Sequence, residues 1–194
     1  RLMEPTGKVI SPGSFIPAAE RYGMMKEIDR WVISNALSTY AQEYGNESDI
    51  VFSINLSSNS LNDEDLLTWI LIQLRESKVA PECICFEVTE TAAIRNLSQA
   101  KQMTNSLKSE GCKFALDDFG SGLSSFAYIK HLPVDFLKID GSFVSDMEQD
   151  TTACAMVAAI NEMGHVLGIK TIAEHVENAT ILEIMRTIGV DYVQ

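Results

Sequence analysis

The sequence has no long hydrophobic run and little positive charge. No apolar stretch approaches the roughly 18 to 20 residues that a membrane-spanning helix needs, and residues Arg1 to Glu4 do not resemble a signal peptide. Only 15 Lys and Arg oppose 27 Asp and Glu, and the resulting net charge of -12 disfavours general nucleic-acid binding through counterion release. These absences predict a soluble cytoplasmic protein, or part of one, in which an anionic ligand would need a local cationic site.

Cysteine is scarce and lacks the spacing of a metal site. The chain contains four cysteines, Cys83, Cys85, Cys112 and Cys154, without a CxxC or CxxH pair. Cys83 and Cys85 alternate along an apolar run, as core residues do. We therefore expect buried, reduced thiols in a reducing compartment, with a structural zinc site as the minor alternative.

The composition is that of a folded domain. Of the 194 residues, 46% are apolar and 22% are charged, which is enough to bury a core of single-domain size. The first residue is not Met, and the last residues, 190–194, look like a strand cut off before its loop. The chain is therefore predicted to be a fragment of a longer protein.

Short apolar runs alternate with helical patterns along the chain. A helical period broken near Gly23 extends from Ser14 to about Tyr44, and predicts one or two amphipathic helices. Strands are expected at 50–55, 83–87, 113–117, 135–139, 170–174 and 190–194, and helical patterns lie near 63–77, 99–110, 124–130, 151–167 and 179–188. Such alternation indicates a parallel sheet and hence an α/β fold.

Each of five consecutive strands carries one polar residue near its carboxyl end, on the face opposite its bulky apolar residues. These residues are Asn55, Glu87, Asp117, Lys138 and Glu174. Any one of them could be a helix cap or a satisfied core polar group. Together they would place carboxylates close to one another, which is costly unless cations neutralise them.

A TIM-type (β/α)₈ barrel with metal ions at its carboxyl-terminal mouth satisfies both demands. Six strands can be counted, so the first strands would lie N-terminal to Arg1, in agreement with a chain shorter than the roughly 250 residues typical of such barrels. The end of the last strand would also lie outside the chain.

A pair of aspartates opens a loop rich in Gly and Ser, Asp117-Asp118-Phe119-Gly120-Ser121-Gly122-Leu123-Ser124-Ser125. Adjacent carboxylates suit one bridging and one terminal metal contact, although the motif alone could be a capped turn. With its neighbours it resembles the EAL-domain family of cyclic di-GMP phosphodiesterases. The other resembling segments, in the family order, are Pro12-x-x-Phe15-Ile16-Pro17-x-Ala19-Glu20, Asn55-x-Ser57, Glu87-Val88-Thr89-Glu90, Lys138-Ile139-Asp140 and Ala173-Glu174-His175-Val176-Glu177.

The resemblance implies a metal-dependent phosphodiesterase that hydrolyses cyclic di-GMP to linear pGpG, with two Mg²⁺ or Mn²⁺ ions activating water. By position, it implies five metal ligands, with Asp117 as the bridging one: Asn55, Glu87, Asp117, Asp118 and Glu174. It implies catalytic roles for Lys138, which would hold the attacking water, and for Glu174 and Asp118. Hard divalent ions prefer carboxylate and amide oxygens, in agreement with these assignments.

Further residues receive roles from the same resemblance. Arg1 and Gln194 would contact substrate, and Glu90 would anchor the loop that follows Asp117. The signature Glu of the family would sit just before Arg1, outside this chain. His175 stands where the family usually has Gly.

The resemblance also bears on organisation and partners. Residues 1–194 would form a partial EAL-type domain of a longer bacterial multidomain signalling protein, and pair as a homodimer through the loop after Asp118 and the following helix. The alternative function is a catalytically inactive EAL-like module that binds cyclic di-GMP or mediates dimerisation. Because every readable ligand position is filled, the sequence favours the enzyme.

Overall fold

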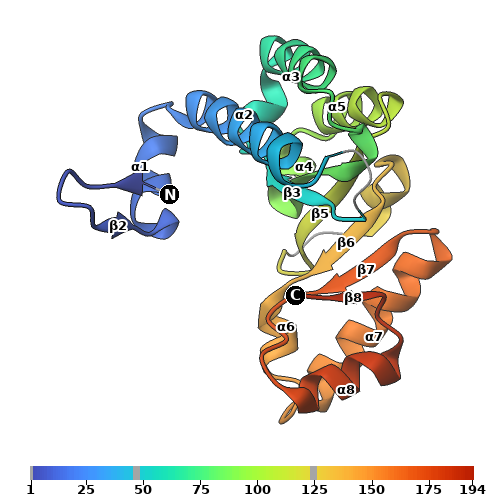
Figure 1. The fold of residues 1–194 in the computed structure, drawn as a ribbon. Coiled ribbons are helices and arrows are strands. Elements are labelled where there is room, and N and C mark those ends of the chain that lie inside the picture. The colour runs from blue at the N-terminus through green and yellow to red at the C-terminus, as the bar shows by residue number, and fades with distance from the viewer. Residues whose placement is uncertain (1, 46–48, 123–125) are drawn as a thin grey trace.

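The computed structural model describes residues 2–45, 49–122 and 126–194. Its centre is a curled parallel sheet of six strands in the order β3-β4-β5-β6-β7-β8 (Figure 1). The strands are β3 Phe52–Asn55, β4 Ile84–Thr89, β5 Lys113–Phe119, β6 Phe136–Ile139, β7 Lys170–Ala173 and β8 Tyr192–Val193. The six strands expected from the sequence are therefore confirmed, and within the described residues β3 and β8 are the edges of this sheet.

Helices connect the parallel strands and cover the outer face of the sheet (Figure 1). The α-helices are α1 Pro12–Arg21, α2 Met25–Glu43, α3 Glu64–Ser77, α4 Glu90–Arg95, α5 Leu97–Ser109, α6 Gly141–Ser145, α7 Thr151–Val166 and α8 Ala179–Ile188. The 3₁₀ helices are η1 Ser60–Asn62, η2 Pro81–Cys83 and η3 Phe126–His131. No helix in the described ranges is both long and apolar enough to span a membrane.

The core lies between the sheet and these helices. Phe86, Phe114 and Leu137, on three neighbouring strands, are fully buried and belong to one hydrophobic cluster. Because successive strand residues point to opposite faces, the residues that alternate with them point to the inner face of the curled sheet. The two-residue period of the apolar residues thus places the polar residues that alternate with them on the inner face of the curled sheet.

Polar side chains cap the starts of α7 and α8. The carboxylate of Asp150 accepts a hydrogen bond from Thr152 N at 2.7 Å at the start of α7, and Asn178 Oδ1 accepts one from Ile181 N at 3.0 Å at the start of α8. Such caps satisfy backbone donors that have no partner within the helix.

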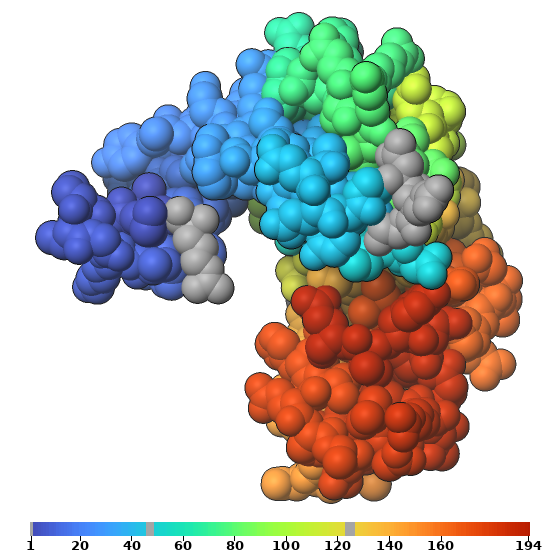
Figure 2. Space-filling view, viewed as in Figure 1, coloured from blue at the N-terminus to red at the C-terminus, as the bar shows by residue number. Residues whose placement is uncertain are grey.

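The N-terminal segment lies apart from the sheet. Leu2–Met3 (β1) and Val9–Ile10 (β2) form an antiparallel hairpin followed by α1, an element that the sequence pattern did not predict because each strand has only two residues. The break expected near Gly23 is confirmed, since Gly23 adopts a φ of 70° between α1 and α2. Figure 2 shows an open hollow between this segment and the C-terminal part of the chain.

Two expectations need adjustment. The helical pattern expected near 124–130 is a 3₁₀ helix over Phe126–His131, and residues 124 and 125 of the expected range lie outside the described residues.

Cys83, Cys85 and Cys112 are buried thiols as expected, but Cys154 is only half-buried. Burial and, second, the charge of Glu87 raise the pKa of Cys85 to about 12, which makes this thiol an inert core residue.

Candidate functional site

The strand register brings the polar residues to one face of the sheet. Asn55 pairs with Glu87 across β3 and β4, and Thr89 pairs with Asp117 across β4 and β5. Lys138 pairs with Ile172, two residues before Glu174. Because residues two apart along a strand share a face, these side chains converge on the inner face, at the carboxyl end of the sheet.

Lys138 is the centre of this group. Its side chain is only 5% exposed, and its Nζ lies 3.1 Å from Glu87 Oε2, 2.8 Å from Asp117 Oδ1 and 2.7 Å from Glu174 Oε1. Burial alone would lower the pKa of Lys138, but the hydrogen bonds to Asp117 and Glu174 and the charges of Glu87 and Asp117 outweigh it and raise the pKa. Lys138 is therefore a permanent cation and a hydrogen-bond donor at neutral pH.

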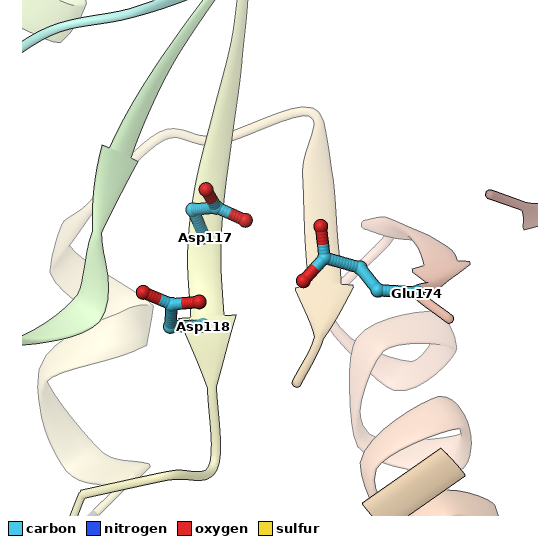
Figure 3. A group of neighbouring side chains, drawn as sticks. All are labelled: Asp117, Asp118 and Glu174. Carbon is cyan, nitrogen blue, oxygen red and sulfur yellow. The ribbon is translucent and has the colours of Figure 1, made fainter. Parts of the chain in front are cut away.

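Two of the carboxylates that contact Lys138 also form a cluster with Asp118. One ligand oxygen from each of Asp117, Asp118 and Glu174 lies within 4.8 Å of the others. Figure 3 shows Asp117 and Asp118 at the end of β5 and Glu174 pointing toward them from the end of β7. Oxygen atoms at this separation can share one divalent cation.

A distortion of β5 makes the cluster possible. Adjacent residues of a regular strand point to opposite faces, but the register of β5 with β6 shifts between Leu116 and Phe119, and Asp118 adopts a left-handed φ of 54°. Burial, followed by the charges of Asp117, Asp140 and Glu174, raises the pKa of Asp118. The charge of Lys138 opposes this rise only in part, so the surroundings of Asp118 disfavour its negative charge.

The donor set fits a divalent metal ion. Glu87, Asp117 and Glu174 share one ammonium, and Asp118 adds a further carboxylate, so the carboxylates outnumber the cationic group at this face. Carboxylate oxygens are the ligands that Mg²⁺, Mn²⁺ and Ca²⁺ prefer. Asn55, exposed at the end of β3, would add an amide oxygen.

Glu90 lies outside this cluster, at the start of α4. It is 2% exposed, its Oε2 accepts a hydrogen bond from Gly120 N at 2.9 Å, and its Oε1 accepts one from the Tyr128 hydroxyl at 2.8 Å. Burial, the hydrogen bond to Glu90 and its charge raise the pKa of Tyr128, so its hydroxyl remains a donor. Sequence reasoning missed Tyr128, for which the only signal was its place shortly after the glycine-rich loop.

Asp29 is a second residue that sequence reasoning missed. It is a buried carboxylate on α2 that accepts hydrogen bonds from Ser57 N at 3.0 Å and from the Ser60 hydroxyl. It thereby holds the segment that follows Asn55. The available signal was its place on the buried stripe of α2, in line with Met25 and Ile33.

Two residues, Arg1 and Gln194, were predicted to contact the substrate. Arg1 lies outside the described residues. Gln194 is exposed. Its backbone N donates to Ala173 O of β7 at 2.8 Å, and its backbone O accepts a hydrogen bond from Val176 N, in the segment after β7, at 2.9 Å. The latter bonds place Gln194 beside Glu174.

The fold and the site together define a class of protein, a TIM-type α/β barrel protein with a candidate divalent-metal centre at the carboxyl ends of its strands. Comparison with known families identifies which one. Residues 1–194 match the EAL domain over the whole chain, and the chain belongs to this family.

Individual relatives agree with this assignment. The chain is 42% identical over 194 residues to the cyclic di-GMP phosphodiesterase PdeB of Shewanella oneidensis, and 34% identical over 194 residues to the cyclic di-GMP phosphodiesterase PdeF of Escherichia coli. These matches cover 100% of this chain but 23% and 26% of the two relatives. The chain thus spans about a quarter of the length of these proteins.

Solved structures match equally well. The FimX EAL domain from Pseudomonas aeruginosa bound to c-di-GMP superimposes with a TM-score of 0.93 at 35% identity, over 100% of this chain and 78% of that one. The PaMucR phosphodiesterase in a c-di-GMP complex gives a TM-score of 0.92 at 31% identity, over 100% and 79%. The six-stranded sheet is therefore part of a TIM-like EAL barrel.

Proposed function

We propose that the protein carrying this domain is a metal-dependent phosphodiesterase that hydrolyses one phosphodiester bond of cyclic di-GMP to give linear pGpG. The observation that carries the proposal is the buried Lys138, held by Glu87, Asp117 and Glu174 directly beside the Asp117, Asp118 and Glu174 cluster. Relatives named as cyclic di-GMP phosphodiesterases support the choice of substrate.

The carboxylates would hold two Mg²⁺ or Mn²⁺ ions, with Asp117 between them. Asn55 and Glu87 would complete one position, and Asp118 and Glu174 the other. When bound, such ions lower the pKa of water and stabilise the charge of the departing oxygen.

The residues of the chain supply the remaining chemistry. Lys138 is cationic because three carboxylates surround it, so it would act as a hydrogen-bond donor that orients the attacking water and stabilises charge on the phosphoryl group, not as a general base. Glu174 would receive a hydrogen bond from that water. Glu90 would hold the loop after Asp117 through Gly120 and Tyr128.

The proposal extends to the surroundings of the site. Arg1 and Gln194 would contact the substrate, and the loop after Asp118 with the following helix would form a homodimer interface. The domain would belong to a longer multidomain signalling protein, in keeping with the length of its relatives. A cytoplasmic location is supported by the cysteine thiols, which are typical of a reducing compartment.

The test follows pGpG formation from cyclic di-GMP by chromatography, with the full-length protein in Mg²⁺, Mn²⁺, Ca²⁺ or excess chelator. We expect turnover with Mg²⁺ and Mn²⁺, binding without turnover in Ca²⁺, whose ligand geometry is looser, and none after chelation. Asp117→Asn should abolish turnover, whereas Asp146→Asn, an exposed aspartate after α6, serves as the matched control and should leave it unchanged.

Full activity after exhaustive chelation would contradict the metal-dependent site. Tight binding of cyclic di-GMP without hydrolysis under every metal condition would instead support the alternative function, an inactive receptor.

A further inference from the structure

His175, the residue directly after Glu174, has an unusual backbone conformation. Its φ is 55°, in the left-handed region. For a residue with a Cβ this conformation is unfavourable and persists where surrounding contacts impose it. The strained residue directly follows Glu174 at the mouth of the site and is exposed.

Gly141 provides the contact that accommodates the imidazole ring. A Cβ at Gly141 would lie 2.2 Å from Nδ1, 2.5 Å from Cγ and 2.8 Å from Cε1 of His175. Atoms cannot approach so closely, so the ring occupies the space that any side chain at position 141 would need. Gly141 is the first residue of α6 and follows β6, the strand that carries Lys138.

The ring contact supplements two other links between β6 and the segment after β7. Glu174 N donates to Ile139 O at 3.3 Å, and Glu174 Oε1 accepts from Lys138 Nζ at 2.7 Å. The backbone hydrogen bond is long, and the ion pair depends on a flexible carboxylate. Val176 N donates to Gln194 O at 2.9 Å on the other side of His175, and the ring of His175 adds a side-chain contact with Gly141 at the residue between these backbone hydrogen bonds.

We infer that His175 is a positioning residue, whose ring seated on Gly141 holds the Glu174 carboxylate in line with Lys138 and Asp117. The inference rests on the proposed function, because it concerns the direction of a proposed metal ligand. It assigns a role to a bulky side chain where the strained backbone would by itself favour glycine.

The test is a double-mutant cycle on Mn²⁺ affinity, measured by calorimetric titration of the full-length protein. Gly141→Ala forces the ring away, and we expect it to weaken Mn²⁺ binding roughly ten- to hundredfold, the scale for losing a residue that orients a ligand. In the His175→Gly background the same substitution has no ring to displace, and should change the affinity by less than about twofold.

Two variants separate the ring from the backbone strain. His175→Ala keeps the strain but removes the ring, and should weaken Mn²⁺ binding by roughly tenfold. His175→Asn tolerates the left-handed region and keeps a flat side chain, so its affinity should be close to that of the wild type. Gly13→Ala is the matched control, because Gly13 has no atom within 4 Å of an added Cβ, and it should leave the affinity unchanged.

His175→Ala also keeps the test valid if Gly141→Ala fails to fold. Wild-type Mn²⁺ affinity in His175→Ala, or an equal loss from Gly141→Ala with and without His175, would overturn the inference. If the wild type hydrolyses cyclic di-GMP and the His175 variants bind Mn²⁺ as tightly as the wild type does, the positioning role is rejected and the proposed reaction stands. Coupled Mn²⁺ affinities without any hydrolysis reject the proposed reaction and leave the positioning role intact, and a wild type that binds no Mn²⁺ overturns both.

Discussion

The ammonium of Lys138 lies 2.7 Å from Oε1 of Glu174, which follows the neighbouring strand. The same ammonium contacts Glu87 and Asp117, so one buried cation on β6 links the carboxyl ends of β4, β5 and β7. In the absence of metal this lysine is the group that offsets their repulsion. Stability at the mouth of the barrel and the chemistry proposed for it would therefore depend on the same side chain.

Replacing Lys138 by Ala should lower both the turnover and the stability of the protein. Turnover of cyclic di-GMP should fall by roughly a hundredfold or more, the scale for one preorganised charge-stabilising donor. Without metal, the free energy of unfolding should fall by about 3–5 kcal/mol, because buried carboxylates lose their partner. Rate assays and urea unfolding with and without Mn²⁺ measure these effects, and the ions should restore part of the lost stability.

Lys101→Ala, a change at an exposed lysine of α5, is the control for this experiment. Unchanged turnover in Lys138→Ala together with lower stability would leave Lys138 a purely structural residue.

Glu90→Ala should loosen the loop after Asp117. The Gly120 amide and the Tyr128 hydroxyl would lose their acceptor. We expect faster hydrogen exchange at Gly120, weaker Mn²⁺ binding and weaker dimer formation, whereas Tyr128→Phe should produce a smaller loss because Gly120 keeps its partner. Glu162→Ala, at an exposed position of α7, should change none of these. Normal exchange and normal Mn²⁺ titration in Glu90→Ala would show that the loop does not depend on this acid.

Asp29→Ala should destabilise the segment after Asn55. The part-buried Ser57 amide and the buried Ser60 hydroxyl would lose their acceptor, at a cost of about 1–3 kcal/mol in the free energy of unfolding. Asp29→Asn keeps an acceptor oxygen and should lose less. Urea unfolding measures the stability, and hydrogen exchange at Ser57 reports whether the loss is local. Equal stability of Asp29→Ala and the wild type would show that this contact contributes nothing.

Asp63 should make stability depend on pH in the acid range. Its carboxylate caps α3 through Asp65 N and Leu66 N and lies 2.9 Å from Lys26 Nζ. The hydrogen bond from Lys26 lowers the pKa of Asp63 below its ordinary value of 3.8; burial opposes this shift and the backbone hydrogen bonds from Leu66 and Asp65 reinforce it. A lowered pKa in the folded state means that the charged form stabilises the fold above pH 3.8, and that this contribution disappears as the pH falls through the lowered value.

Asp63→Asn removes the charge and keeps a good cap. It should therefore cost about 0.5–1 kcal/mol at pH 7, and the difference from the wild type should vanish as the pH falls through the lowered pKa of Asp63. Denaturant unfolding across this range measures the difference. A cost that does not change with pH would mean that the charge of Asp63 is not responsible.

Local periodicity was enough to determine much of this protein. The two-residue period of the strands is a property of neighbouring residues, so the sequence alone predicted the six parallel strands and placed Glu87, Asp117, Lys138 and Glu174 on one face. The motifs around Asp117 and Lys138 were likewise enough to indicate the EAL family. Elements too short to show a period, such as α6 and the β1–β2 hairpin, could not be found in this way.

Tertiary structure alone decided how these residues meet. Which carboxylates share the ammonium of Lys138 depends on the stagger of neighbouring strands, and the direction of Asp118 depends on a left-handed backbone that no sequence period reports. The contacts of Asp29 with Ser57 and of His175 with Gly141 join segments that are distant in the sequence. Such contacts depend on how whole helices and strands pack against one another. The residues next to a side chain in the sequence do not indicate which distant residue it contacts in the fold, so the sequence pattern could not predict these contacts.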